Sequence, residues 1–164
     1  KVGVSNSGTL TADQVVLNAN QNSALMSSLV NNTGVIEATN LVEIKSGKIQ
    51  QNGSIAKKVT TTTLIIPPIT ITTATPTTTI SMEATDEITT SSTSITRAGT
   101  LNLEVTKEGA SIGTQTTSLR VDADTLIATT DHCNVYVKDT GDDLTIGSID
   151  TGVVDLTSPP LLPR

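Results

Sequence analysis

Apolar and polar residues alternate along several short stretches of this chain. The clearest cases are residues 101–105 (LNLEV), 119–123 (LRVDA) and 135–138 (VYVK). An apolar residue at every second position is typical of a β-strand that buries one face. Glycine, asparagine and aspartate separate such stretches, as at residues 139–141 (DTG), and these residues favour tight turns. The pattern therefore predicts many short strands joined by turns, and it offers no convincing helix.

Apolar positions also recur at a longer interval. Leu64, Met82, Leu101, Leu119 and Val137 stand 18 or 19 residues apart. A period of about 18–20 residues accommodates about three short strands and three turns, as one coil of a parallel β-helix requires. A β-sandwich more often places strands at steps of about 8–12 residues without a higher period. We therefore expect an all-β fold, a right-handed parallel β-helix (β-solenoid), and expect the chain to be a segment of a longer solenoid.

This period also predicts which strands stack on one another. Residues 101–105, 119–123 and 135–138 should lie as neighbouring parallel strands on one face of the coil. Arg120 would then cover the ring of Tyr136, and Asp122 could pair with Lys138. The two predicted inward columns are Leu101, Leu119 and Val135, and Leu103, Val121 and Val137.

The spacing of the repeated pattern changes in two parts of the chain. Near the N-terminus, residues 5–12 (SNSGTLTA) align with residues 31–38 (NNTGVIEA) at an offset of 26. The Thr-rich residues 60–96 contain three prolines, which would suit a linker, but they also keep supplying isoleucines that a solvated linker does not need. We predict one β-helix domain over residues 1–164, with regular coils at about 4–56 and 99–154 and irregular Thr-rich coils at about 57–98.

Composition restricts the core and the partners. Phe and Trp are absent, Tyr136 is the one aromatic residue, and 32 residues are threonine. Val, Ile, Leu and Ala must therefore fill the interior, which suits a narrow stem of stacked strands. The net charge of −6 argues against a nucleic-acid partner. No stretch reaches the roughly 20 apolar residues that a membrane-spanning helix needs, so we expect no membrane insertion.

Residues suited to catalysis or metal binding are few. His132 and Cys133 are the one histidine and the one cysteine, so a Ser-His-Asp triad, an internal disulfide and a four-ligand zinc site are all disfavoured. On a strand these two neighbours would point to opposite faces. Asp139, Asp142 and Asp143 are weak candidates for calcium, since Asp-rich turns with glycine can offer oxygen ligands. We expect no catalytic residues and no cofactor.

Several segments resemble a known family of secreted proteins. Residues 4–17 (VSNSGTLTADQVVL) and 30–38 (VNNTGVIEA) resemble the recurring N-x-G-x-I/L-x-A…V-x-L rung of filamentous haemagglutinin-like exoproteins. Residues 110–114, 119–121 together with 125–126, 134–137 and 144–149 are similar to the degenerate repeats of very long members. These proteins are the adhesins of two-partner secretion systems. The resemblance implies a right-handed β-helix, export, and a place in the extracellular space or on the cell surface.

Two functions follow as expectations. The first is a structural stem, or passenger segment, of a secreted or surface-displayed bacterial adhesin, which has no enzymatic activity. Its partners would be glycans or proteins on host or neighbouring cells and the flanking coils of the same polypeptide. The alternative is a β-helical carbohydrate-active enzyme such as a polysaccharide lyase, which needs basic residues beside clustered aspartates. An enzyme should gather on one face at least two of five basic residues: Arg97, Lys107, Arg120, His132 and Lys138.

Overall fold

The computed structural model describes residues 2–19, 28–57, 61–66, 69–74, 78–141 and 143–152. This part of the chain is all-β and contains no helix, which confirms the all-β part of the predicted fold class. Its strands are β1 (Val2–Asn6), β2 (Thr9–Asn18), β3 (Ser28–Asn32), β4 (Val35–Gln51), β5 (Ser54–Lys57), β6 (Thr61–Ile66), β7 (Ile69–Ala74), β8 (Thr79–Thr90), β9 (Ile95–Val105), β10 (Leu119–Thr130), β11 (Val137–Asp139) and β12 (Thr145–Asp150).

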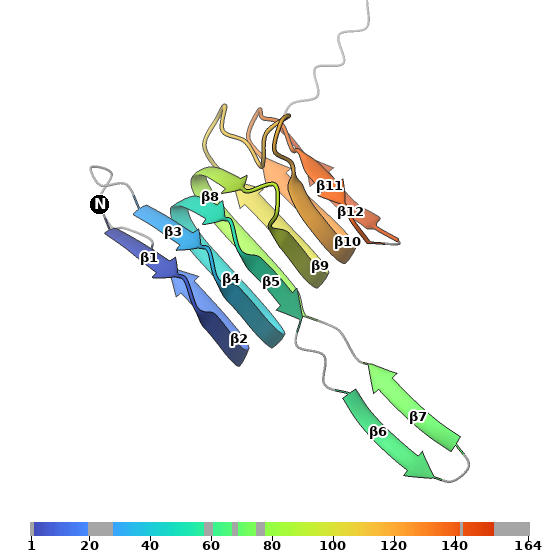
Figure 1. Ribbon diagram of the computed structural model, residues 1–164. Coiled ribbons are helices and arrows are strands. Elements are labelled where there is room, and N and C mark those ends of the chain that lie inside the picture. The colour runs from blue at the N-terminus through green and yellow to red at the C-terminus, as the bar shows by residue number, and fades with distance from the viewer. Residues whose placement is uncertain are drawn as a thin grey trace, which may run out of the picture.

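Ten of these strands form one sheet, in which the strand pairs are parallel. Figure 1 shows them side by side, from β1 in blue to β12 in red. Because the long strands bend, different parts of one strand pair with different neighbours. Strand β4 pairs with both β5 and β8, and these two pair with β9, so four parallel strands close into a ring.

The parallel pairings fall into three ladders, each of which takes one segment from successive passes of the chain. The first ladder contains β1, β3, the ends of β4 and β8, and isolated bridges at Ile112 and Val135. The second contains the starts of β2, β4, β9 and β10 together with β5 and β11. The third contains the end of β2, the middle of β4, the start of β8, the ends of β9 and β10, and β12.

Each ladder sends a column of mostly aliphatic side chains into a narrow core. Equivalent residues of paired strands lie about 4.8 Å apart, so their side chains touch directly and exclude water. No aromatic residue is needed because the space between the ladders is thin. The columns are Val4, Val30, Ile49, Ile88, Ile112 and Val135 in the first ladder; Leu10, Ile36, Ile55, Thr96 and Val121 in the second; and Val15, Val42, Ile80, Leu101 and Leu126 in the third. Asp139 and Ile146 follow at the ends of the second and third columns, outside the buried core.

A row of buried amides lines the corner between the first and second ladders. Asn6 Nδ2 donates to Asn32 Oδ1 at 2.8 Å, and Asn32 Nδ2 donates to Gln51 Oε1 at 3.1 Å. Gln51 Nε2 then donates to the carbonyl oxygen of Gly53 at 3.2 Å. Since each amide both donates and accepts, the row satisfies polar groups that would otherwise be costly to bury.

Glycines follow two residues after each of these amides, at positions 8, 34 and 53. A Cβ on Gly34 would lie 2.1 Å from the oxygen of Gly8, and one on Gly53 would lie 2.0 Å from the oxygen of Gly34. The backbones of successive passes therefore approach too closely for any side chain. This corner explains the repeated N-x-G pattern, and it confirms the predicted offset of 26, since Asn6 pairs with Asn32.

The predicted register of the C-terminal strands is wrong. Leu101 pairs with Leu126 and Ile80, not with Leu119. Leu119 pairs with Val137 instead of Val135. A fixed period fails because the corners differ in length: residues 106–118, for example, separate β9 from β10. The inward direction of the predicted leucines and Val121 is nevertheless confirmed, because all are buried.

The predicted outward contacts are wrong for the same reason. Arg120 lies opposite Lys138 in the ladder rather than over Tyr136. Asp122 lies opposite Arg97 and pairs with it, Nε to Oδ2, at 3.4 Å. A shift of two residues keeps each side chain on the predicted side of its strand but gives it different neighbours.

The Thr-rich stretch does not form the irregular coils predicted for residues 57–98. Strands β6 and β7 pair only with each other, as an antiparallel hairpin that extends away from the parallel sheet (Figure 1). Pro67 and Pro68 stand in sequence between them. Proline has no N–H to donate to a ladder, so it suits a connection better than an inner strand. From Thr79 onward, β8 rejoins the parallel sheet with regular pairing.

Candidate functional site

Lysines on β4 form ion pairs with acidic residues of β4 itself and of the neighbouring strand β8. Lys45 Nζ lies 3.1 Å from both Glu43 Oε1 and Glu83 Oε2. Lys48 Nζ lies 2.9 Å from Glu87 Oε1. These hydrogen bonds to carboxylates raise the pKa of both ammonium groups above the ordinary value. For Lys45, the hydrogen bond to Glu83 is the largest cause of the raised pKa. Such exposed pairs neutralise the stacked acids and add little stability each.

A charged corner lies where Lys48 and Lys107 approach the acids at the bend of β8. Lys107 Nζ contacts Asp86 Oδ1 at 3.0 Å, and Lys48 contacts Glu87. A cavity of about 320 Å³ is lined by these four side chains together with residues 108–110. Both lysines are paired with carboxylates, so this corner presents no excess of positive charge to a ligand.

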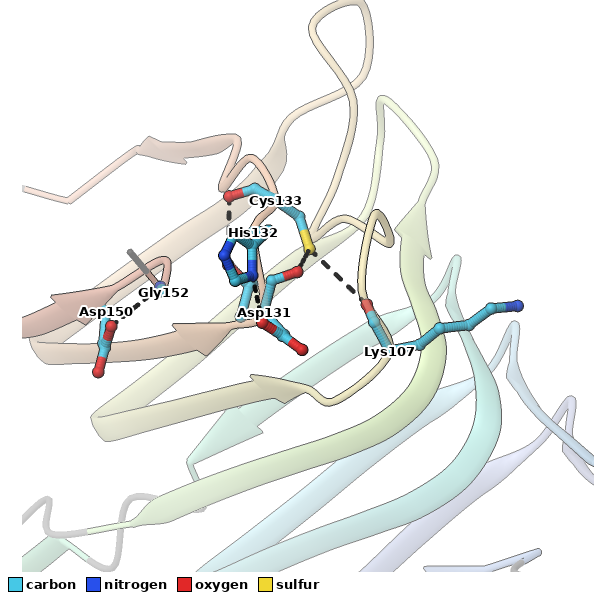
Figure 2. A network of polar contacts seen from close by, with 7 residues as sticks. Lys107, Asp131, His132, Cys133, Asp150 and Gly152 are labelled. Atoms are coloured by element: carbon cyan, nitrogen blue, oxygen red, sulfur yellow. Dashed lines mark hydrogen bonds and ion pairs between the residues drawn. The ribbon is translucent and has the colours of Figure 1, made fainter. Parts of the chain in front are cut away.

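The turn after β10 contains Asp131, His132 and Cys133, which Figure 2 shows from close by. Asp131 Oδ1 lies 2.5 Å from His132 Nδ1, and the Cys133 thiol donates to the carbonyl oxygen of Asp131 at 2.7 Å. The backbone of His132 has a positive φ of 56°. Its N–H donates to the carbonyl oxygen of Thr151 at 3.0 Å, which helps to hold this conformation.

This turn places His132 and Cys133 outside any strand, so the expectation of opposite strand faces does not apply to them. The thiol of Cys133 contacts main-chain oxygens of Asp131 and Lys107. Within the described residues, no hydroxyl or thiol donates to the imidazole of His132. The Asp131–His132 pair therefore orients an imidazole without presenting a nucleophile beside it.

Of the calcium candidates, Asp139 lies on β11, at the end of the second ladder. Asp139 Oδ1 accepts a hydrogen bond from the backbone N–H of Gly141 at 3.0 Å, which closes a local turn. Asp143 is exposed, and Asp142 lies outside the described residues. Among the residues that the structure describes, no three His, Cys, Asp or Glu side chains gather in a way that could hold a metal ion.

A second group of basic residues lies on the outward side of the second ladder. We call Arg97, Arg120, Asp122 and Lys138 the basic face. The β9–β10 pairing sets Arg97 opposite Asp122, and the β10–β11 pairing sets Arg120 opposite Lys138. Three of the five basic residues that an enzyme was expected to gather thus share one face.

The remaining two basic residues lie elsewhere. Lys107 is at the charged corner, and His132 is in the turn after β10. The basic face contains one described ion pair with an aspartate, that of Arg97 with Asp122. Among the described residues, it gathers cations without a group of three or more acidic side chains that could hold the calcium ion of a calcium-assisted lyase.

Sequence reasoning missed a set of hydroxyl groups beside the basic face. A pocket of about 350 Å³ is lined by Ser92, Thr116, Thr117, Ser118, Arg120 and Lys138. The Thr-Gln-Thr-Thr-Ser run at residues 114–118 was a possible signal, but nothing in the linear sequence indicated that Ser92 or Lys138 would lie next to it.

No family model, curated protein or solved structure matches this chain. Across the described residues there is also no helix long and apolar enough to cross a membrane.

Proposed function

We propose that the chain is a right-handed parallel β-helix that serves as a structural stem of a secreted or surface-displayed bacterial adhesin and supports cell adhesion. The observation that carries this proposal is the set of three parallel ladders, whose inward columns continue from one pass of the chain to the next. Such a stack gains stability from each neighbouring coil, so it can be extended without enlarging its cross-section. Extension without a thick core is what a projecting stem requires.

The last described coil has an exposed aliphatic edge, which indicates that another coil packs against it. Ile146 and Ile149 continue inward columns, opposite Leu126 and Ala128, yet 52% and 48% of their surface is exposed. Exposed aliphatic side chains at the end of a stack favour contact with another aliphatic row. We infer that flanking coils of the same polypeptide cover this edge in the working protein.

The resemblance to filamentous haemagglutinin-like exoproteins supports the proposed location. The two segments that carry it, residues 4–17 and 30–38, contribute Gly8 and Gly34 to one corner. The motif therefore coincides with a corner where successive passes lie too close for a side chain. We propose that the protein acts outside the cell or on its surface, where a stem can present a binding tip to other cells.

Two experiments on cells that produce the whole protein test this proposal. An antibody against residues 28–57 should label intact, unpermeabilised cells; labelling only after permeabilisation would contradict an external location. In-frame deletion of residues 28–57 should lower adhesion to host or neighbouring cells. Replacement of the whole segment by an unrelated solenoid of equal length should restore adhesion if the segment is a stem, and a failure to restore it would argue against a purely structural role.

A β-helical carbohydrate-active enzyme remains the second candidate because Arg97, Arg120 and Lys138 share one face with Asp122. A basic residue could remove a proton from a sugar acid while another neutralises its carboxylate. Incubation of the purified chain with polyuronides, followed by detection of unsaturated products, tests this activity. We expect no product, and product formation would replace the stem proposal with the enzymatic one.

A further inference from the structure

The pocket beside the basic face is built from segments that are distant in sequence. Ser92 comes from the turn between β8 and β9, residues 116–118 come from the loop before β10, and Arg120 and Lys138 lie on adjacent strands. We call this site the hydroxyl pocket. It lies on the outward side of the second ladder, away from the aliphatic core. Its volume of about 350 Å³ is at the lower end of the range typical of small-molecule sites.

The charges in the hydroxyl pocket are not balanced. Arg120 and Lys138 lie directly opposite each other on parallel strands, which costs stability because like charges repel. Within the described residues neither forms an ion pair with a carboxylate, whereas Lys45, Lys48, Arg97 and Lys107 all do. In the part of the chain that the structure describes, no acidic side chain lines the pocket. An anion between the two cations would remove this repulsion.

One hydrogen bond holds the Arg120 guanidinium in place and leaves its other N–H groups available to a ligand. Its Nη1 donates to the carbonyl oxygen of Ser92 at 3.1 Å, which fixes the guanidinium against the turn between β8 and β9. A guanidinium carries five N–H donors in a planar fork that matches the two oxygens of a carboxylate. One bond to Ser92 therefore orients the group and leaves other donors for a ligand.

The backbone of the loop that carries these hydroxyl groups is held by its own hydrogen bonds. The backbones of Thr114 and Thr117 bond each other in both directions, at 3.0 and 3.2 Å. The N–H of Thr117 also donates to Thr114 Oγ1 at 2.9 Å. Gly113 at the start of the loop has φ of 67°, and a Cβ there would lie 2.5 Å from the oxygen of Tyr136. A loop fixed in this way presents hydroxyls at little entropic cost to binding.

We propose that the hydroxyl pocket binds a carboxylate-bearing saccharide. Arg120 and Lys138 take the carboxylate, and the hydroxyls of Ser92, Thr116 and Thr117 exchange hydrogen bonds with the ring hydroxyls. No aromatic residue lines the pocket to stack on a sugar ring, so the affinity is low, with a Kd on the order of 1 mM. This inference goes beyond the proposed stem function, which requires no ligand at this place.

Titration of a short oligogalacturonate into the isotopically labelled full chain, followed by NMR, tests the proposal. We expect shifts at residues 92, 114–120 and 138, and at least tenfold weaker binding of the fully methyl-esterified oligosaccharide, which keeps the ring hydroxyls but has no charge. Equal binding of the ester would overturn the role of the two cations. Equally tight binding of inorganic phosphate or of a sulfated oligosaccharide would show a general anion site and overturn the assignment to a sugar carboxylate.

Variants connect the binding to the named residues. The double variant Arg120→Gln/Lys138→Gln should lose binding at least tenfold, whereas Lys107→Gln, which removes a cation outside the pocket, should leave it unchanged. Circular dichroism checks that each variant folds. The proposal is supported if the folded double variant no longer shows the NMR chemical-shift changes caused by the oligogalacturonate. Unchanged binding by the double variant would refute the site. Binding of the saccharide without formation of unsaturated products would be compatible with the stem proposal. Conversely, a negative outcome of the surface-labelling and adhesion experiments would not change the measured binding.

Discussion

Replacement of Gly34 by alanine should separate two adjacent passes of the chain. The added Cβ would lie 2.1 Å from the oxygen of Gly8 and 2.8 Å from its nitrogen. Favourable carbon contacts lie at about 3.5–4.0 Å, so the obstacle is more than an ångström too close. Because both contacting atoms belong to the backbone, no side-chain rotation can relieve the clash.

The cost can be worked from the bonds that this separation disturbs. The N–H groups of Thr33 and Gly34 both donate to the oxygen of Asn6, at 2.8 and 3.0 Å, and the N–H of Val35 donates to the oxygen of Gly8 at 2.8 Å. Overpacking a tight contact costs about 1–3 kcal/mol, and each weakened bond contributes up to about 1 kcal/mol. We therefore expect Gly34→Ala to lower the free energy of unfolding by about 2–4 kcal/mol.

Gly8 is the matched control because it occupies the equivalent position at the outer end of the stack. A Cβ on Gly8 would meet nothing within 4 Å, and Gly8 does not have a positive φ. Gly8→Ala should be neutral or stabilise by up to about 1 kcal/mol, since alanine restricts the unfolded chain. Gly53→Ala should resemble Gly34→Ala, because its Cβ would lie 2.0 Å from the oxygen of Gly34.

Urea denaturation followed by far-ultraviolet circular dichroism measures these differences, with the slope m compared between variants. The close approach of the two passes would be refuted if Gly34→Ala unfolds within about 0.5 kcal/mol of the parent chain. Equal destabilisation by Gly8→Ala would also refute it, because the loss of stability would then come from replacing any glycine of this motif and not from a clash with the neighbouring pass.

Three further predictions use the same denaturation assay. Val121→Asp should lower the free energy of unfolding by about 3–5 kcal/mol, because Val121 is fully buried. Val16→Asp should be nearly neutral, because Val16 is 55% exposed. Equal losses of stability in the two variants would contradict the inward direction of Val121. Asn32→Ala should cost about 2–4 kcal/mol by leaving Asn6 and Gln51 without their shared partner, and a cost below about 0.5 kcal/mol would argue against the amide row. The stability difference between the parent chain and Lys45→Gln should be constant from neutral pH up to the ordinary lysine pKa of 10.5. It should disappear as pH rises through the raised pKa of Lys45, because the folded state binds this proton more tightly than the unfolded state. A difference that grows with pH would contradict the assigned pairing with Glu83.

The sequence alone determined that the fold is all-β and, in the alternating stretches, on which side of the strand a residue lies. Alternation at 101–105 and 119–123 correctly placed Leu101, Leu119 and Val121 in the core, because a period of two assigns every side chain to a face. The N-x-G pattern also located one true stacking offset, between Asn6 and Asn32. Both signals are local, so they survive without knowledge of the rest of the chain.

Only the tertiary structure decided which strands are neighbours, and therefore where a site can form. Alternation is unchanged when a strand moves by two residues, so it could not choose between Val135 and Val137 as the partner of Leu119. The choice depends on the lengths of the corners, which follow no hydrophobic pattern. The hydroxyl pocket depends on that choice, because it exists only where Arg120 meets Lys138 and the loop before β10 folds back beside Ser92.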